Sequence, residues 1–146
     1  MQEKDVTKLI PQRQPIVMID GFAGIDEAGV SHTTLRIQSQ NMFCENGRLS
    51  ECGIIEHMAQ SAAARVGWIA LQQGEKVRLG FIGAVDKLEV IEFPQVGQTL
   101  YTEISVKQEV FGISLVHAEV LTDGKKVASG NMKIVLEDAT EQSKKE

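Results

Sequence analysis

The spacing of hydrophobic residues changes along the chain from the period of a helix to the period of a strand. Between residues 52 and 72 there is no proline, and apolar side chains recur at the three- and four-residue intervals typical of a helix. Ser50 or Glu51 stands where an N-terminal cap is expected. After residue 78, apolar and polar residues alternate, as they do in half-buried strands. The pattern predicts one long helix over residues 52–72, followed by strands.

Turn residues divide the rest of the chain into strands. β-Branched and apolar residues flank a turn at residues 26–29, which predicts a hairpin over residues 20–38. Residues 39–51 carry few large apolar side chains and are expected to form a loop. After the helix, the turns Phe111-Gly112 and Asp123-Gly124 help to separate four runs, at residues 78–91, 98–109, 112–122 and 126–136. We expect an α+β fold, in which an antiparallel sheet of about five to six strands, four of them in a meander, curls around the helix.

The length of 146 residues fits one domain, and no linker or internal repeat divides the chain. We expect this domain to occupy residues 1–136. Residues 137–146 carry six charged side chains and no large apolar one, so we expect them to form a disordered tail.

The predicted helix is apolar or small on nearly every side. One half carries large apolar residues, and the other half includes Ala63, Ala64 and Gly67. We therefore expect the helix to be covered on most sides, with small residues allowing close approach of the backbone. Glu56 and Arg65 interrupt the apolar stretch well inside its length, which argues against a membrane span.

Composition excludes several classes of function. A net charge of −5, with only five Phe, one Trp and one Tyr, disfavours nucleic acid as a partner. Cys44 and Cys52 are too few for a disulfide framework, and the charged start of the chain does not resemble a secretory signal, so a reducing, cytoplasmic environment is expected. These cysteines and His57 lack a fourth zinc ligand, and no phosphate-binding loop is found, so no metal or cofactor is expected.

Glu56 is the main candidate for chemistry because it lies inside a helix that we expect to be buried. Burial favours the protonated form of a carboxyl group, which suits a general acid near neutral pH. Gln60 lies one turn further on the same face and can bind Glu56 or a ligand carbonyl. The alternative is a carboxylate that is merely satisfied by a neighbouring arginine or backbone group. His57 points about 100° away from Glu56, so a structural or interfacial role is expected for it.

Several segments resemble one enzyme family. Residues 56–60, Glu-His-Met-Ala-Gln, resemble the Glu-x-Met-Ala-Gln run of the (3R)-hydroxyacyl-acyl-carrier-protein dehydratases. Residues 11–15 are similar to the amino-terminal Pro-His-Arg-x-Pro run of that family, and residues 81–83 to its Phe-x-Gly strand. The similarity extends over about residues 9–136. The Asn-Gly-Arg-Leu loop at residues 46–49 resembles a divergent branch that is associated with aryl-polyene and flexirubin-type pigment synthesis.

This resemblance implies the hotdog fold, in a homodimer or higher oligomer whose subunit interfaces hold tunnels for a pantetheine-linked acyl chain. It assigns to Glu56 the role of the family's helix glutamate, which assists departure of the β-hydroxyl group. Gln60 carries over as its polar support, and the Gly83 backbone as a contact to the thioester carbonyl. Further substrate contacts are expected from Phe81, Met58 and Phe43.

The chain also departs from the family. The family's loop histidine, which removes the α-proton, has no counterpart in residues 43–52, and Gln12 replaces the histidine of the amino-terminal motif. We therefore predict a dehydratase of 3-hydroxyacyl thioesters, linked to acyl carrier protein or coenzyme A, in fatty-acid or polyene-type biosynthesis, with Glu56 as the acid. Glu56 can serve as the sole acid-base group if the α-proton and the hydroxyl group lie on the same side of a fixed substrate. The alternatives are a non-catalytic acyl-binding or partner subunit of a histidine-bearing homologue, and a hotdog thioesterase.

An acidic carrier protein requires a local basic rim on a chain of net negative charge. The candidates for this rim are Arg48, Arg65, Lys76, Arg78 and Lys87.

Overall fold

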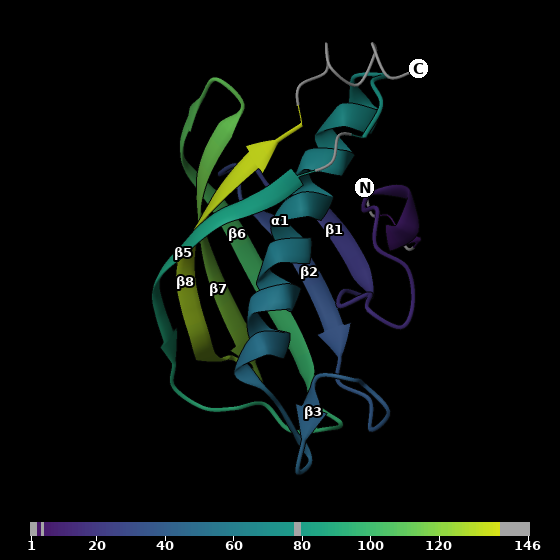
Figure 1. Cartoon of the computed structure of the whole chain (residues 1–146), viewed down its shortest axis with the longest axis vertical. Helices are drawn as coiled ribbons and strands as arrows, with labels where there is room; N and C mark the ends of the chain where they lie inside the picture. Colours follow the sequence, from purple (N-terminus) through teal and green to yellow (C-terminus); the bar gives the residue numbers. More distant parts are fainter. Residues whose placement is uncertain (1–2, 4, 78–79, 138–146) are drawn as a thin grey trace.

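A computed structural model describes residue 3, residues 5–77 and residues 80–137 (Figure 1). The tail that the sequence predicts to be disordered lies outside the described residues from residue 138 onward. The elements in chain order are η1 (Val6–Lys8), β1 (Gly21–Ile25), β2 (Ser31–Arg36), β3 (Cys44–Glu45), β4 (Arg48–Leu49), α1 (Glu51–Gln72), β5 (Gly80–Val90), β6 (Thr99–Val110), β7 (Ile113–Thr122) and β8 (Lys125–Leu136). The predicted helix, the hairpin over residues 20–38 and the four later strands are therefore all present.

One six-stranded antiparallel sheet curls around α1, which lies along its inner face (Figure 1). The strand order is β1-β2-β6-β7-β8-β5, so β1 and β5 form the two edges. This arrangement confirms the expected α+β class.

Two details of the topology differ from the prediction. The four later strands do not form a meander, because β5 pairs with β8 at the far edge and the chain then crosses to start β6 beside β2. Alternation of apolar residues defines the faces of a strand but not its neighbours, so the pattern did not reveal this crossover. The predicted loop at residues 39–51 contains the short hairpin β3–β4, whose turn residues Asn46 and Gly47 have positive φ angles of 53° and 77°.

The core has two parts, on different sides of α1. Ile54, Met58 and Ala62 pack against the inner face of the sheet. A second cluster joins the helix to the N-terminal segment, where Leu9 lies against Gly67. A Cβ atom on Gly67 would lie 2.1 Å from the Leu9 carbonyl oxygen, so only glycine allows this approach.

The structure thus confirms the expectation that most sides of α1 are covered, but one face stays open. Its partly exposed or exposed residues are Cys52, Ile55, Glu56, Ala59, Ala63 and Val66. The helix begins at Glu51, and the Ser50 hydroxyl caps it by accepting a hydrogen bond from the Gly53 N–H at 3.2 Å. Within the described ranges, no helix is long and apolar enough to cross a membrane.

Candidate functional site

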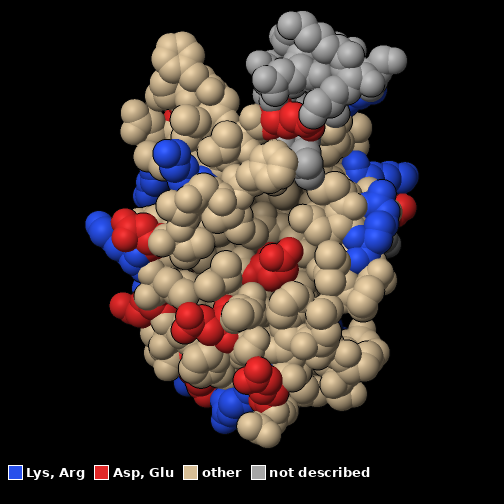
Figure 2. Space-filling view, in the orientation of Figure 1, with Lys and Arg blue, Asp and Glu red and all other residues tan. Residues whose placement is uncertain are grey.

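Glu56 lies on the open face of α1 and is partly exposed, not buried as the sequence predicted. The sheet and the N-terminal segment cover the other sides of the helix and leave this side uncovered within a single chain. The nearby residues of the face are small or apolar, including Ile55, Ala59 and Ala63. In Figure 2 the middle of this side of the molecule is mostly uncharged, and the basic residues lie toward its margins. Glu56 is therefore a carboxyl group on an otherwise apolar surface.

Gln60 holds Glu56 and is itself held by the backbone. Its Nε2 donates to Glu56 Oε1 at 2.8 Å and to the Ile16 carbonyl oxygen at 2.7 Å. Its Oε1 accepts from the Met18 N–H at 2.6 Å. Gln60 is fully buried, and both ends of its amide are occupied. Of the two alternatives for Gln60, the structure shows the bond to Glu56, and the amide supports that carboxyl group.

His57 is structural within this chain. It is fully buried, and its ring contacts the Met18 carbonyl oxygen and the Thr102 hydroxyl oxygen, each at 2.7 Å. Burial lowers the pKa of His57 to about 4, so the ring is neutral at physiological pH. The ring does not reach the open face, which agrees with the role expected from its position next to Glu56.

The remaining predicted site residues are not gathered around Glu56 in one chain. Met58 is fully buried in the core, where its methyl group lies beneath Gly130. Phe43 is partly buried against the first turn of α1. Phe81, 54% exposed, and Gly83 lie on the edge strand β5, across the sheet from the N-terminal segment that holds Gln60. Gly83 falls in a register irregularity between Ile82 and Ala84, which leaves it without a paired residue on β8.

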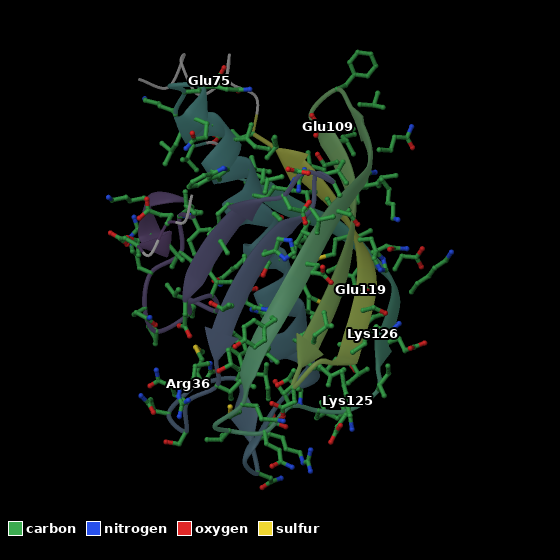
Figure 3. All side chains as sticks on the ribbon, turned by 180° about the vertical axis from the view of Figure 1, so that it is seen from behind. Arg36, Glu75, Glu109, Glu119, Lys125 and Lys126 are labelled. Carbon is green, nitrogen blue, oxygen red and sulfur yellow. The ribbon has the colours of Figure 1, made fainter. Side chains whose placement is uncertain are left out.

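The chain has three histidines, and the described structure places none of them beside Glu56. His57 faces inward. His32 contacts Asp26 at 2.8 Å, and His117 contacts Asn131 at 2.7 Å. Figure 3 views the sheet from its outer side, where the labelled Glu119 lies 3.3 Å from the His117 ring. Among the described residues, no histidine ring bonds to Glu56, so a histidine that acts on the substrate beside Glu56 would come from another chain.

The basic residues proposed for a carrier-binding rim differ in their surroundings. Arg65 points inward and donates to the carbonyl oxygens of Gly29 and Ile104, so it ties α1 to the sheet. Arg48 borders a hollow of about 400 Å³ at the start of α1 and donates to the Phe93 carbonyl oxygen at 2.7 Å. Lys87 is exposed on β5. Arg78 lies outside the described residues.

Cys44 and Cys52 are free thiols, and burial raises the pKa of the Cys44 thiol. Among the described residues, no three His, Cys, Asp or Glu side chains gather in an arrangement that could hold a metal ion.

Sequence reasoning missed Thr102 and the Met18 backbone as parts of the network behind Glu56. The only sequence feature that points to these two residues is His57, a histidine on a side of the helix that the core covers.

A family model for ApeP-like proteins, described as ApeP dehydratase, matches residues 4–145. The chain belongs to the ApeP-like dehydratase family. It is also 25% identical over 118 residues to the 3-hydroxyacyl-[acyl-carrier-protein] dehydratase FabZ of Caldanaerobacter subterraneus subsp. tengcongensis, covering 77% of this chain and 82% of that protein. The expected family resemblance is thus confirmed.

Solved structures confirm the hotdog fold of this ApeP-like chain. The dehydratase heterocomplex ApeI:P from Xenorhabdus doucetiae superposes with a TM-score of 0.85 at 17% identity, covering 95% of each chain. A hypothetical thioesterase from Streptococcus pneumoniae, solved with coenzyme A, gives a TM-score of 0.63 at 8% identity, covering 80% of this chain and 84% of that one. At these identities the likeness concerns the fold.

Proposed function

We propose that this ApeP-like protein removes water from 3-hydroxyacyl thioesters carried by acyl carrier protein or coenzyme A. One observation carries the proposal: the Glu56 carboxyl group stands on an apolar, open helix face, with one oxygen held by a buried amide. That arrangement suits a single acid-base group facing a substrate of low polarity. Membership of the ApeP-like dehydratase family supports the same reaction class.

The reaction can be completed with Glu56 alone. The carboxylate oxygen that Gln60 leaves open, Oε2, takes the α-proton of the 3-hydroxyacyl thioester. The electron pair of the broken C–H bond forms the double bond to the β-carbon as the C–O bond breaks. Glu56 then returns its proton to the departing hydroxyl group, which leaves as water, and the enoyl thioester remains. The Gln60 N–H to Oε1 stabilises the carboxylate before and after each cycle.

The proposed site needs a second chain to cover it. The open face of α1 and the exposed edge strand β5, with Phe81, Ile82 and Val85, are apolar surfaces that a subunit interface would bury. We assign Phe81 and Gly83 of one chain to the same acyl site as Glu56 of its partner, with the Gly83 N–H donating to the thioester carbonyl. The assembly is thus a homodimer or a larger oligomer.

A second candidate function is that of a partner subunit in a mixed assembly. In the part of the chain that the structure describes, no histidine ring bonds to Glu56, which favours this function, and so does the structural neighbour described as a dehydratase heterocomplex. In that case the chain alone is inactive, and a histidine-bearing homologue completes the site. Arg48 and Lys87 are the candidate contacts for an acidic carrier in either assembly.

The test is to incubate the purified protein with 3-hydroxyacyl thioesters of several chain lengths, on carrier protein and on coenzyme A. Mass spectrometry of the acyl group detects the loss of water, and a thiol reagent detects hydrolysis of the thioester. Enoyl product from the protein alone supports the first function, and enoyl product only after addition of a copurifying homologue supports the second. Free thiol without enoyl product contradicts both functions and indicates a thioesterase.

A further inference from the structure

A buried chain of hydrogen bonds connects the sheet to Glu56 through His57. We propose that His57 is a positioning residue for Glu56: its ring holds the Met18 backbone in the place where the Met18 N–H orients the Gln60 amide. The inference rests on the proposed function of Glu56, but the geometry behind it belongs to this chain alone. Its links are Thr102 on β6, His57 on α1, Met18 before β1, and Gln60 and Glu56 on α1.

The hydrogen-bond partners determine which nitrogen of the His57 ring carries the proton. The Met18 carbonyl oxygen, 2.7 Å from Nδ1, can only accept, so Nδ1 must donate. A neutral ring has a single N–H, so Nε2 accepts from the Thr102 hydroxyl at 2.7 Å. Both ring nitrogens are therefore satisfied in one tautomer, and the ring orientation is fixed by groups from two different elements.

The backbone of Met18 links the His57 ring to Gln60. The Met18 carbonyl accepts from His57, and the Met18 N–H, in the adjoining peptide group, donates to Gln60 Oε1 at 2.6 Å. If the Gln60 amide were reversed, its oxygen would face the Ile16 carbonyl and the Glu56 carboxylate, which are both acceptors. The amide is thus held in the orientation that presents N–H to Glu56 Oε1 and leaves Oε2 to the substrate.

His57 acts on Glu56 only through this chain. Consecutive helical residues point about 100° apart, so the ring faces the core while the carboxyl group faces the open side. A role in folding alone does not require the tautomer or the link to Gln60. Another buried polar pair, between β2 and the same helix, provides the comparison, because Thr33 donates to the Ser61 hydroxyl at 2.7 Å without touching Met18 or Gln60.

Two substitutions of similar size test the two hydrogen bonds of the His57 ring separately. The amide nitrogen of His57→Asn occupies the place of Nδ1 and keeps a donor for the Met18 carbonyl. The longer amide of His57→Gln reaches the place of Nε2 and keeps Thr102 but loses Met18. Thr33→Val is the matched control, because it removes a buried hydrogen bond beside the same helix.

The first measurement is steady-state turnover of the active assembly. We expect His57→Gln to lower kcat by about 10²-fold with little change in KM, because a small displacement of an acid-base group has a cost of that order. His57→Asn is expected to stay within a few-fold of the wild type, and Thr33→Val to leave kcat unchanged at a similarly lowered Tm. Equal losses of kcat in His57→Asn and His57→Gln, or a comparable loss in Thr33→Val, would overturn the proposal.

The second measurement is NMR on ¹⁵N-labelled protein, which needs no turnover. We expect a neutral His57 ring with its proton on Nδ1, and Gln60 side-chain amide protons that exchange slowly with solvent. These amide protons should exchange faster in His57→Gln and remain protected in His57→Asn and Thr33→Val. A proton on Nε2, or unchanged Gln60 exchange in His57→Gln, contradicts the proposal. Absence of turnover in every assembly refutes the proposed function. The NMR measurement then still decides whether His57 positions Glu56.

Discussion

Lowering the pH is expected to destabilise the protein through His57. The ring is fully buried, and desolvation lowers its pKa from the ordinary 6.5 to about 4, although the bond to the Met18 carbonyl opposes the shift. In the unfolded chain the ring binds a proton below about pH 6.5, while in the folded chain it stays neutral down to about pH 4. The unfolded state thus binds more protons in this window, so stability falls as the pH falls.

The magnitude follows from the size of this shift. Each pKa unit corresponds to about 1.4 kcal/mol, so the full loss approaches about 3 kcal/mol below pH 4. Between pH 8 and pH 5 the expected loss from His57 is about 2 kcal/mol, because most unfolded rings are protonated at pH 5 and most folded rings are not.

The assay is urea unfolding of the wild type and of His57→Asn at both pH values and at one protein concentration, since assembly contributes to apparent stability. The two proteins share every other titratable group, so the difference between the two pH dependences isolates His57. We expect the free energy of unfolding of the wild type to fall by about 2 kcal/mol more than that of the variant. Equal pH dependences would show that the ring is not held neutral by burial.

Three further predictions concern packing, capping and assembly. Gly67→Ala should lower the free energy of unfolding, measured in urea, by about 2 kcal/mol, because the new Cβ would overlap the Leu9 carbonyl. Helix propensity alone predicts that this free energy would rise by about 1 kcal/mol, and such a rise would contradict the close approach. Ser50→Ala should cost about 1 kcal/mol by removing the cap of α1, while Ser50→Asp should be nearly neutral in the same assay. Val85→Lys on β5 should shift sedimentation toward the monomer without loss of the circular dichroism signal; an unchanged assembly would place the interface elsewhere.

Local patterns in the sequence predicted the elements well, because each depends on neighbouring residues. The prediction of α1 differed from the structure by one residue at its start, since an uninterrupted helical period and a Ser50 cap determine that boundary. The β3–β4 hairpin was missed although Asn46-Gly47 is a strong turn signal, because its strands have only two residues each. The place of β5 at the sheet edge depends on a crossover between distant segments, which alternation does not encode.

In the candidate site, too, the sequence predicted contacts between neighbouring residues but not contacts between distant segments. The Glu56–Gln60 bond joins residues one helical turn apart, so spacing was enough to propose it. His57 meets its partners 39 and 45 residues away in the sequence, and no periodicity places Met18 or Thr102 beside it. The partial exposure of Glu56 was also missed, because a periodic pattern does not show which side of a helix stays uncovered within a single chain.

The most direct test of the central claim compares Glu56→Gln with Glu51→Gln in the dehydration assay. Both residues lie in the first two turns of α1. Glu51 is exposed at the start of the helix, and among the described residues no hydrogen bond joins it to Gln60. If Glu56 moves the protons, Glu56→Gln should lower kcat for enoyl thioester formation by about 10²- to 10⁴-fold, with Glu51→Gln unchanged. Turnover by Glu56→Gln at the wild-type rate would contradict the account.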